Sequence, residues 1–160
     1  MEPASRAEDE RTGERLPTAE EINPTPGCLD EECACRNFLG RTRREAEELF
    51  RDNLLHYSED LLWMGPRAFE FYVRAAIDYL KSEHARGDCD GVSAFHGTIE
   101  LRARHDDLPA IPALIEALGY IIREFDRFGA SIDIYGHLRA EYRALLEWLR
   151  AKQAPPGSAP

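Results

Sequence analysis

Apolar residues recur at intervals of three and four along the middle of this chain, and this spacing is the pattern of amphipathic α-helices. The longest apolar stripe runs through residues 111–128, and a second runs through residues 69–80. Shorter stripes mark residues 92–105 and 138–149. Since helices of this kind bury their apolar faces against one another, the sequence predicts an all-α protein, a bundle of five or six helices.

Local signals predict where several helices begin and end. Thr42 followed by Glu45 forms a capping box, which predicts a helix from there to about Asn53. A short amphipathic segment follows, and Ser58 is its expected N-cap. The glycine before Pro66 breaks that segment, and Pro66 suits the first turn of the next helix.

Composition divides the chain into one domain and two tails. Residues 1–27 combine Pro, Gly and Ser with an excess of acidic residues and few large apolar ones, so we expect a disordered acidic arm. Residues 28–152 form the single helical domain, and residues 153–160 form a disordered tail. Within the domain, residues 132–135 would also pass as a short strand, and Asp133 is the expected cap of the last helix.

The balance of charge limits the classes of partner. The chain has 30 acidic and 20 basic residues, a formal net charge of −10. Nucleic-acid binding rests on neutralising phosphates, and anionic membranes attract basic surfaces, so both are disfavoured here. We expect a protein partner instead, and a basic one in particular. The sequence has no secretory signal and no apolar stretch that would cross a membrane, which favours a cytoplasmic protein.

A cysteine cluster is the one group of residues with the composition of a chemical site. Cys28, Cys33 and Cys35 lie close together, and Cys89 follows much later. Zinc favours four sulfur or nitrogen ligands, so these residues, with His84 as a substitute ligand, are a candidate zinc site. The C-x4-C-x-C spacing differs from the paired C-x2-C of zinc ribbons. Neighbouring carboxylates should also raise the pKa values of the thiols, which disfavours a reactive thiolate. The alternative is a set of small, half-buried residues at the edge of the domain.

Aromatic residues gather around the break between two predicted helices. Phe71 lies off the apolar stripe of its helix, and Trp63 and Met64 come directly before the helix-breaking turn. Exposed aromatic residues and Met beside arginines have the composition of a binding patch, while packing of the short helix on its neighbour is the alternative. The candidate patch comprises Tyr57, Trp63, Met64, Arg67, Phe71 and Arg74.

Histidines offer few candidates for catalysis. His96 and Glu100 are four residues apart and share a helix face, so they are a candidate metal or acid–base pair. A hydrogen-bonded histidine at the edge of the core is the alternative. His56, with two acidic residues shortly after it, is a further ligand set without supporting spacing. The sequence has no metalloprotease, serine hydrolase, P-loop or dinucleotide motif, and we assign no catalytic residue.

Residues 59–80, EDLLWMGPRAFEFYVRAAIDYL, resemble a segment of small uncharacterised bacterial proteins. In that pattern an apolar stretch is followed by Gly or Ser before Pro, and then by Ala-Phe and further aromatic residues. The resemblance implies a helical protein of bacterial origin and no transferable activity.

Two functions follow from these features. The first is a non-catalytic acidic interaction module that binds another macromolecule, for example as an immunity- or antitoxin-like inhibitor. The second is a zinc-binding or thiol-based protein that uses Cys28, Cys33 and Cys35, in which zinc would be the cofactor.

Overall fold

A computed structural model describes the backbone of residues 7–130 and 132–154, and their side chains apart from those of residues 132 and 133. This part of the chain is all-α, as predicted, and its one β-bridge joins Glu8 to Arg15. The helices are α1 (Ala19–Ile22), α2 (Leu29–Phe38), α3 (Arg43–Trp63), α4 (Pro66–Lys81), α5 (Cys89–Arg104), α6 (Ile111–Arg123), α7 (Ile132–Tyr135) and α8 (Leu138–Gln153), with 3-10 turns η1 (Glu83–Ala85) and η2 (Phe125–Phe128).

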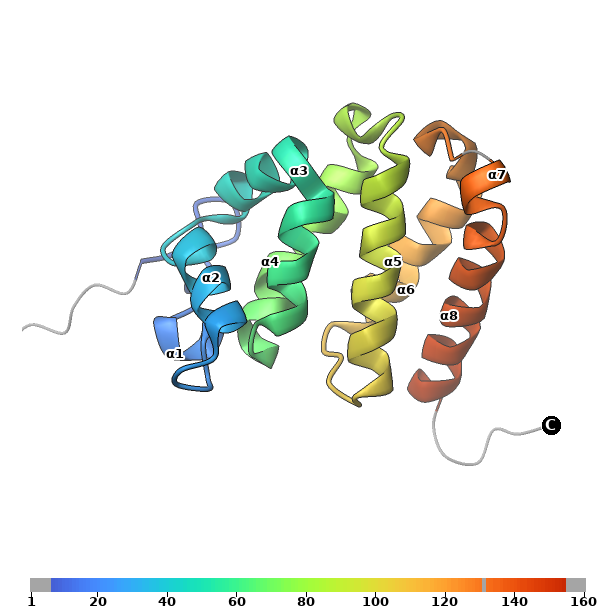
Figure 1. The fold of residues 1–160 in the computed structure, drawn as a ribbon. Coiled ribbons are helices and arrows are strands. Elements are labelled where there is room, and N and C mark those ends of the chain that lie inside the picture. The colour runs from blue at the N-terminus through green and yellow to red at the C-terminus, as the bar shows by residue number, and fades with distance from the viewer. Residues whose placement is uncertain (1–6, 131, 155–160) are drawn as a thin grey trace, which may run out of the picture.

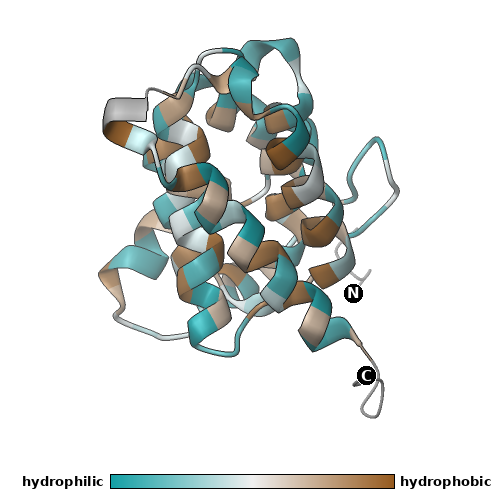
Figure 2. Cartoon of the chain, turned by 90° about the vertical axis from the view of Figure 1, so that its right-hand side faces the viewer, coloured by the Kyte–Doolittle hydropathy of each residue, from teal (hydrophilic) through white to brown (hydrophobic). Residues whose placement is uncertain are grey.

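The long helices lie in two layers. The second half of α3, α5 and α8 run side by side toward the same end of the molecule, and α4 and α6 lie behind them (Figure 1). Helix α3 packs against both α4 and α5, and α6 packs against α8. Both hydrophilic and hydrophobic residues recur along the helices (Figure 2), as expected of helices with one apolar face.

Helix α4 occupies the centre of the core. It begins at Pro66, as the sequence predicts, because the fixed φ of proline and its missing N–H suit the first helical turn. Its predicted apolar stripe is buried, and so are residues on its other faces, because α3 and the N-terminal segment cover the sides that the stripe leaves free. The buried residues are Ala68, Phe69, Phe71, Tyr72, Val73, Ala75, Ala76, Ile77, Tyr79 and Leu80.

Helix α3 has the predicted start and an unpredicted break. The capping box of Thr42 and Glu45 is present. Asn53 then leaves the helical conformation, with φ −162° and ψ 86°, and its side-chain oxygen accepts a hydrogen bond of 3.0 Å from the backbone N–H of His56. Asn53 therefore caps the second half of α3. The prediction of Ser58 as that cap is wrong, because Ser58 lies inside the helix and donates to the carbonyl of Leu55.

A buried arginine holds the end of α3. Arg102, on α5, is 3% exposed, and its Nη1 donates to the carbonyl oxygens of Leu61, Leu62 and Met64 at 3.1, 2.9 and 2.7 Å. The last carbonyls of a helix have no partner within it, so this one side chain supplies the donors that the C-terminus of α3 lacks. The guanidinium also lies 4.2 Å from the ring centroid of Phe69. Arg102 thus joins α5 to both α3 and α4.

The N-terminal segment is packed on the domain from residue 7 onward, so the prediction of a disordered arm is wrong for residues 7–27. Leu16 and Ile22 are buried against the core. Asp9 is 1% exposed, and it accepts a 2.7 Å hydrogen bond from the backbone N–H of Arg43, at the start of α3. Burial opposes ionisation of Asp9, but the N–H donors around it prevail and lower its pKa. Residues 1–6, and 155–160 of the predicted tail, lie outside the described residues.

The C-terminal third follows the prediction in its apolar faces and departs from it in the helix ends. Helix α6 stops at Arg123 and the turn η2 continues to Phe128, where the sequence predicts one helix. Residues 132–135 form the helical turn α7 and no strand, and the predicted capping side chain of Asp133 lies outside the described residues. The predicted stripe of α8 is buried. No helix in residues 7–130 and 132–154 combines the length and apolar character needed to cross a membrane.

Candidate functional site

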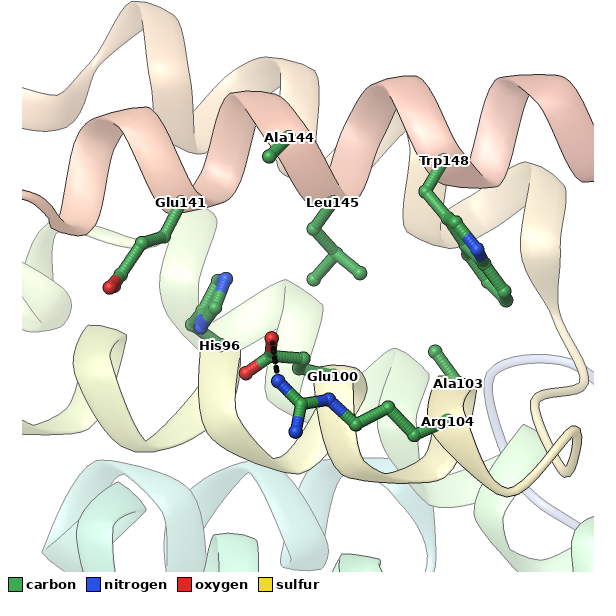
Figure 3. Close-up of a pocket in the computed structure, with 8 residues that line it drawn as sticks. All are labelled: His96, Glu100, Ala103, Arg104, Glu141, Ala144, Leu145 and Trp148. Carbon is green, nitrogen blue, oxygen red and sulfur yellow. Dashed lines mark hydrogen bonds and ion pairs between the residues drawn. The ribbon is translucent and has the colours of Figure 1, made fainter.

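A cleft of about 370 Å³ lies between α5 and α8, which face one another with little direct contact (Figure 3). Its floor is apolar and its rim carries charged side chains. Trp148 stands at one end and is 38% exposed, and His96 stands toward the other. The residues that line the cleft are His96, Glu100, Ala103 and Arg104 from α5 and Glu141, Ala144, Leu145 and Trp148 from α8.

His96 is buried, yet its imidazole lacks a partner in the described part of the chain. It is 6% exposed, and its ring meets the ring of Tyr142 edge-on at 4.9 Å between centroids. The hydroxyl of Tyr142 donates to the backbone carbonyl of Val92, and burial raises the pKa of this tyrosine well above its ordinary value, so the phenol keeps its proton. Within the described residues the imidazole forms no hydrogen bond, and it projects into the cleft (Figure 3). His96 therefore lies at the edge of the core, as expected, but its side chain does not form the expected hydrogen bond with any described residue.

Three charged residues surround the opening. Glu100 accepts a 2.8 Å hydrogen bond from Arg104, one turn further along α5, and so pairs with that arginine and not with His96 (Figure 3). Glu141 reaches the same opening from α8 and has no ion pair with any described residue. With one arginine against two glutamates, the lining carries a net charge of −1.

A second hollow, of about 480 Å³, lies on the other side of α5, beside the end of α3. Trp63 and Leu101 line it and are 42% and 41% exposed, and Arg102 lines it as well. Because Leu101 and Arg104 are neighbours on α5, the two hollows form one surface along the C-terminal half of that helix. We call this the α5 surface, with Trp63 on one flank and Trp148 on the other.

The aromatic patch predicted from the sequence is divided by the fold. Trp63 is partly exposed, Met64 is 2% exposed and borders the same hollow as Trp63, and Phe71 is fully buried. Phe71 is covered because the guanidinium groups of Arg43 and Arg67 lie 5.1 and 5.7 Å from its ring centroid. Arg67 also donates to a carbonyl of the N-terminal segment.

The other two members of that patch are engaged locally. Tyr57 packs edge-on against Phe38, with 6.1 Å between ring centroids. Arg74 forms an ion pair of 3.6 Å with Glu70 on its own helix. Of the predicted patch, Trp63 and the nearly buried Met64 line the α5 surface.

The cysteines that the sequence groups together take different positions. Cys28 is the residue before α2, Cys33 is exposed on it, and Cys35 is half-buried against the core. Burial, with a contribution from Glu20, raises the pKa of Cys35, in the predicted direction. Cys89 is the first residue of α5, which packs on α3 and α8, whereas α2 packs on α1 and α3 (Figure 1).

Several residues of the types that can bind metals line a hollow between α2 and α3, without forming a ligand group. Cys33, His56 and Asp60 line a hollow of about 330 Å³ between α2 and α3, together with Asp30 and Glu59, and the amide of Asn37 donates to Asp60 there at 2.8 Å. His84, the substitute ligand, is exposed on η1. In the part of the chain with described side chains, no three His, Cys, Asp or Glu residues are grouped so that they could hold a metal ion.

The cleft residues on α8 were not found from the sequence. Trp148 lies outside the buried stripe of its helix, which runs through Leu145 and Leu149. A tryptophan outside the apolar stripe of an amphipathic helix was therefore the signal that could have been used.

The fold and this surface define an all-α protein with a hollowed face along one helix. Comparisons of the chain with models of protein families, with curated proteins and with solved structures find no match.

Proposed function

We propose that this protein is a non-catalytic interaction module whose α5 surface binds a basic segment of another protein. One observation carries the proposal: Trp63 and Trp148, both partly exposed, line the two hollows that flank α5. Tryptophan is the residue most enriched among the anchors of protein interfaces, where it fills or borders pockets. Trp63 and Trp148, one on each side of α5, therefore offer a partner two separate anchor points.

Charge supports a basic partner. The chain has a net charge of −10. Locally, acidic residues exceed basic ones by one in each hollow: Glu31 and Asp107 against Arg102 beside Trp63, and Glu100 and Glu141 against Arg104 beside Trp148. Arg102, although it lines one hollow, is buried with its donors directed at protein oxygens. Complementary charge of this kind accelerates association and selects partners.

Gly97 supports close approach of a partner to α5. It lies in the middle of the helix, one turn before Leu101, and a side chain added there would meet nothing within 4 Å. Glycine inside a helix costs about 1 kcal/mol relative to alanine, and no packing in this structure accounts for it. A partner whose backbone passes over α5 at this point would account for it.

The test begins with native mass spectrometry of the untagged protein, purified at low salt and without chelator from its own organism. The expected result is a complex with a second protein that dissociates as the salt concentration rises. Purified partner is then titrated against Trp63→Ala and Trp148→Ala, which should each weaken binding about tenfold or more, in the range of interface anchors.

Leu29→Ala is the matched control, because Leu29 is 74% exposed on α2 and lines neither hollow, so its loss should leave the affinity unchanged. Equal affinities for all three variants would refute the α5 surface as the binding site. A mass excess of one zinc ion, lost on adding chelator, with no protein bound would favour the metal-binding alternative.

A further inference from the structure

A histidine side chain with no hydrogen-bond partner among the described residues lines the cleft between α5 and α8. His96 is 94% buried, since its exposed fraction is 6%, and its imidazole is directed into the cleft (Figure 3). The ring nitrogens of His96 are not among the described side-chain atoms that are both fully buried and unpaired, so they are open to the cleft, where water or a ligand can bond them. No described protein atom forms a hydrogen bond with the imidazole, so the cleft offers a ligand one free hydrogen-bonding group.

A carboxylate faces the same space. Glu141 comes from α8, opposite the α5 residues, and has no ion pair within the described residues (Figure 3). The nearby cations are already paired: Arg104 with Glu100 at 2.8 Å, and Lys152, beyond Trp148, with Asp106 at 2.8 Å. The remaining charge in the cleft is therefore negative, and it favours a cationic ligand over an anionic one.

Between these polar groups and Trp148 the cleft is apolar and narrow. Ala103, Ala144 and Leu145 supply small or aliphatic surfaces, and the indole of Trp148 stands at the end (Figure 3). This arrangement suits a side chain with an aliphatic stem and a flat cationic head. Lysine fits less well, because its ammonium is a compact and strongly hydrated charge, whereas a guanidinium is planar, stacks on aromatic rings and directs five donors to different acceptors.

We infer that the α5–α8 cleft is the receptor for an arginine side chain of the partner. The inference rests on the proposed function and specifies one anchor of the partner. The guanidinium donates to the carboxylate of Glu141 and to a ring nitrogen of His96, and the stem lies along Leu145 toward Trp148. Binding of this kind satisfies His96 and pairs Glu141 in one step.

The test uses a defined probe, Nα-acetyl-arginine methylamide, added to the full chain. The matched compound is the citrulline derivative, which has nearly the same shape and no charge. Binding is followed by the NMR signal of the Trp148 indole N–H, which Trp63→Phe distinguishes from the other indole. The arginine derivative should bind at least about tenfold more tightly than the citrulline derivative, equivalent to about 1.4 kcal/mol.

Two variants locate the charge that makes this difference. Glu141→Gln should reduce the affinity for the arginine derivative about tenfold and leave the affinity for the citrulline derivative unchanged. Glu147→Gln is the control, because Glu147 is an exposed glutamate of α8 that does not line the cleft. Equal binding of the arginine and citrulline derivatives, equal effects of the two variants, or equal binding of the lysine derivative would each overturn the inference.

The same variants separate this inference from the proposed function. If Trp148→Ala weakens binding of the purified partner and Glu141→Gln does not, the α5 surface is the docking site and the arginine receptor is refuted. If Trp63→Ala, Trp148→Ala and Glu141→Gln all leave the affinity for the partner unchanged, the proposed function fails together with the arginine receptor.

Discussion

Replacing Arg102 with methionine should destabilise the fold more than any exposed substitution on α5. Methionine keeps most of the apolar stem, so it retains much of the packing on Phe69 while it removes every donor of the guanidinium. Those donors serve the last carbonyls of α3 and the residue Asp107, which lies beyond the end of α5. The substitution therefore tests whether a charged group, and not its volume, joins α3 to α5.

The magnitude follows from the bonds that are lost. Two of the carbonyls that Arg102 serves, those of Leu61 and Met64, are bonded in buried surroundings. A hydrogen bond to a charged group contributes about 1.5–3 kcal/mol, so two such bonds give a loss of about 3–6 kcal/mol in the free energy of unfolding. The ion pair with Asp107 adds little, because the Asp107 side chain is 47% exposed and pairs of that kind contribute about 0–1 kcal/mol.

The assay is urea denaturation followed by circular dichroism, with the free energy of unfolding taken at matched denaturant slopes. Arg104→Met is the control, because Arg104 is on the same helix and its side chain is 68% exposed. This control should change stability by less than about 0.5 kcal/mol. Asp107→Asn should cost no more than about 1 kcal/mol. A loss below about 1 kcal/mol for Arg102→Met, or a loss equal to that of the control, would refute the reasoning.

Three further predictions concern other parts of the fold. Asn53→Ala should lower the free energy of unfolding by about 1 kcal/mol in urea, while Asn53→Asp, which keeps a capping oxygen, should change it little. Burial raises the pKa of Asp60, so its ionisation opposes folding at neutral pH; Asp60→Asn should be more stable than the wild type at pH 7, and the difference should shrink as the pH falls toward 4 in parallel thermal melts. Gly65→Ala should expose the N-terminal segment to limited proteolysis, because the new methyl group overlaps the backbone of α1, whereas Gly97→Ala, in open space, should raise stability by about 0.5–1 kcal/mol.

The helices were predictable where the apolar residues of a segment lie on one helix face or where a capping box marks the start. The stripes of α4 and α8 are both buried as their spacing predicts, and the capping box at Thr42 begins α3. These features are local, since a spacing of three or four residues and a cap that reaches three residues ahead need no knowledge of the rest of the fold. The burial of Phe71 agrees with the packing alternative and not with the binding patch, because a helix at the centre of a bundle buries several faces and its stripe identifies only one.

The N-terminal segment was misjudged because its stabilising contacts are few and distant in sequence. Composition classes residues 7–27 as disordered, yet Ile22 is fully buried and Asp9 accepts a hydrogen bond from the start of α3, 34 residues further along. A scale that averages hydrophobicity over a segment cannot register two or three well-placed anchors. The break at Asn53 is a similar case, because asparagine caps a helix by a single hydrogen bond that leaves no mark on the apolar periodicity.

The cleft depends on which helices become neighbours, and this is why sequence periodicity did not reveal it. On their own helices, Ala103 and Ala144 are ordinary helix-forming residues, and they become the walls of a gap only when α5 lies beside α8. The larger side chains hold the two helices apart: the rings of His96 and Tyr142 meet at one end, and Trp148 stands at the other. Closing the gap by substituting larger apolar residues for the alanines would bury more apolar surface and would also cover His96. A sequence under pressure for stability alone would favour that change, so the open cleft is a further feature that supports the proposed binding role.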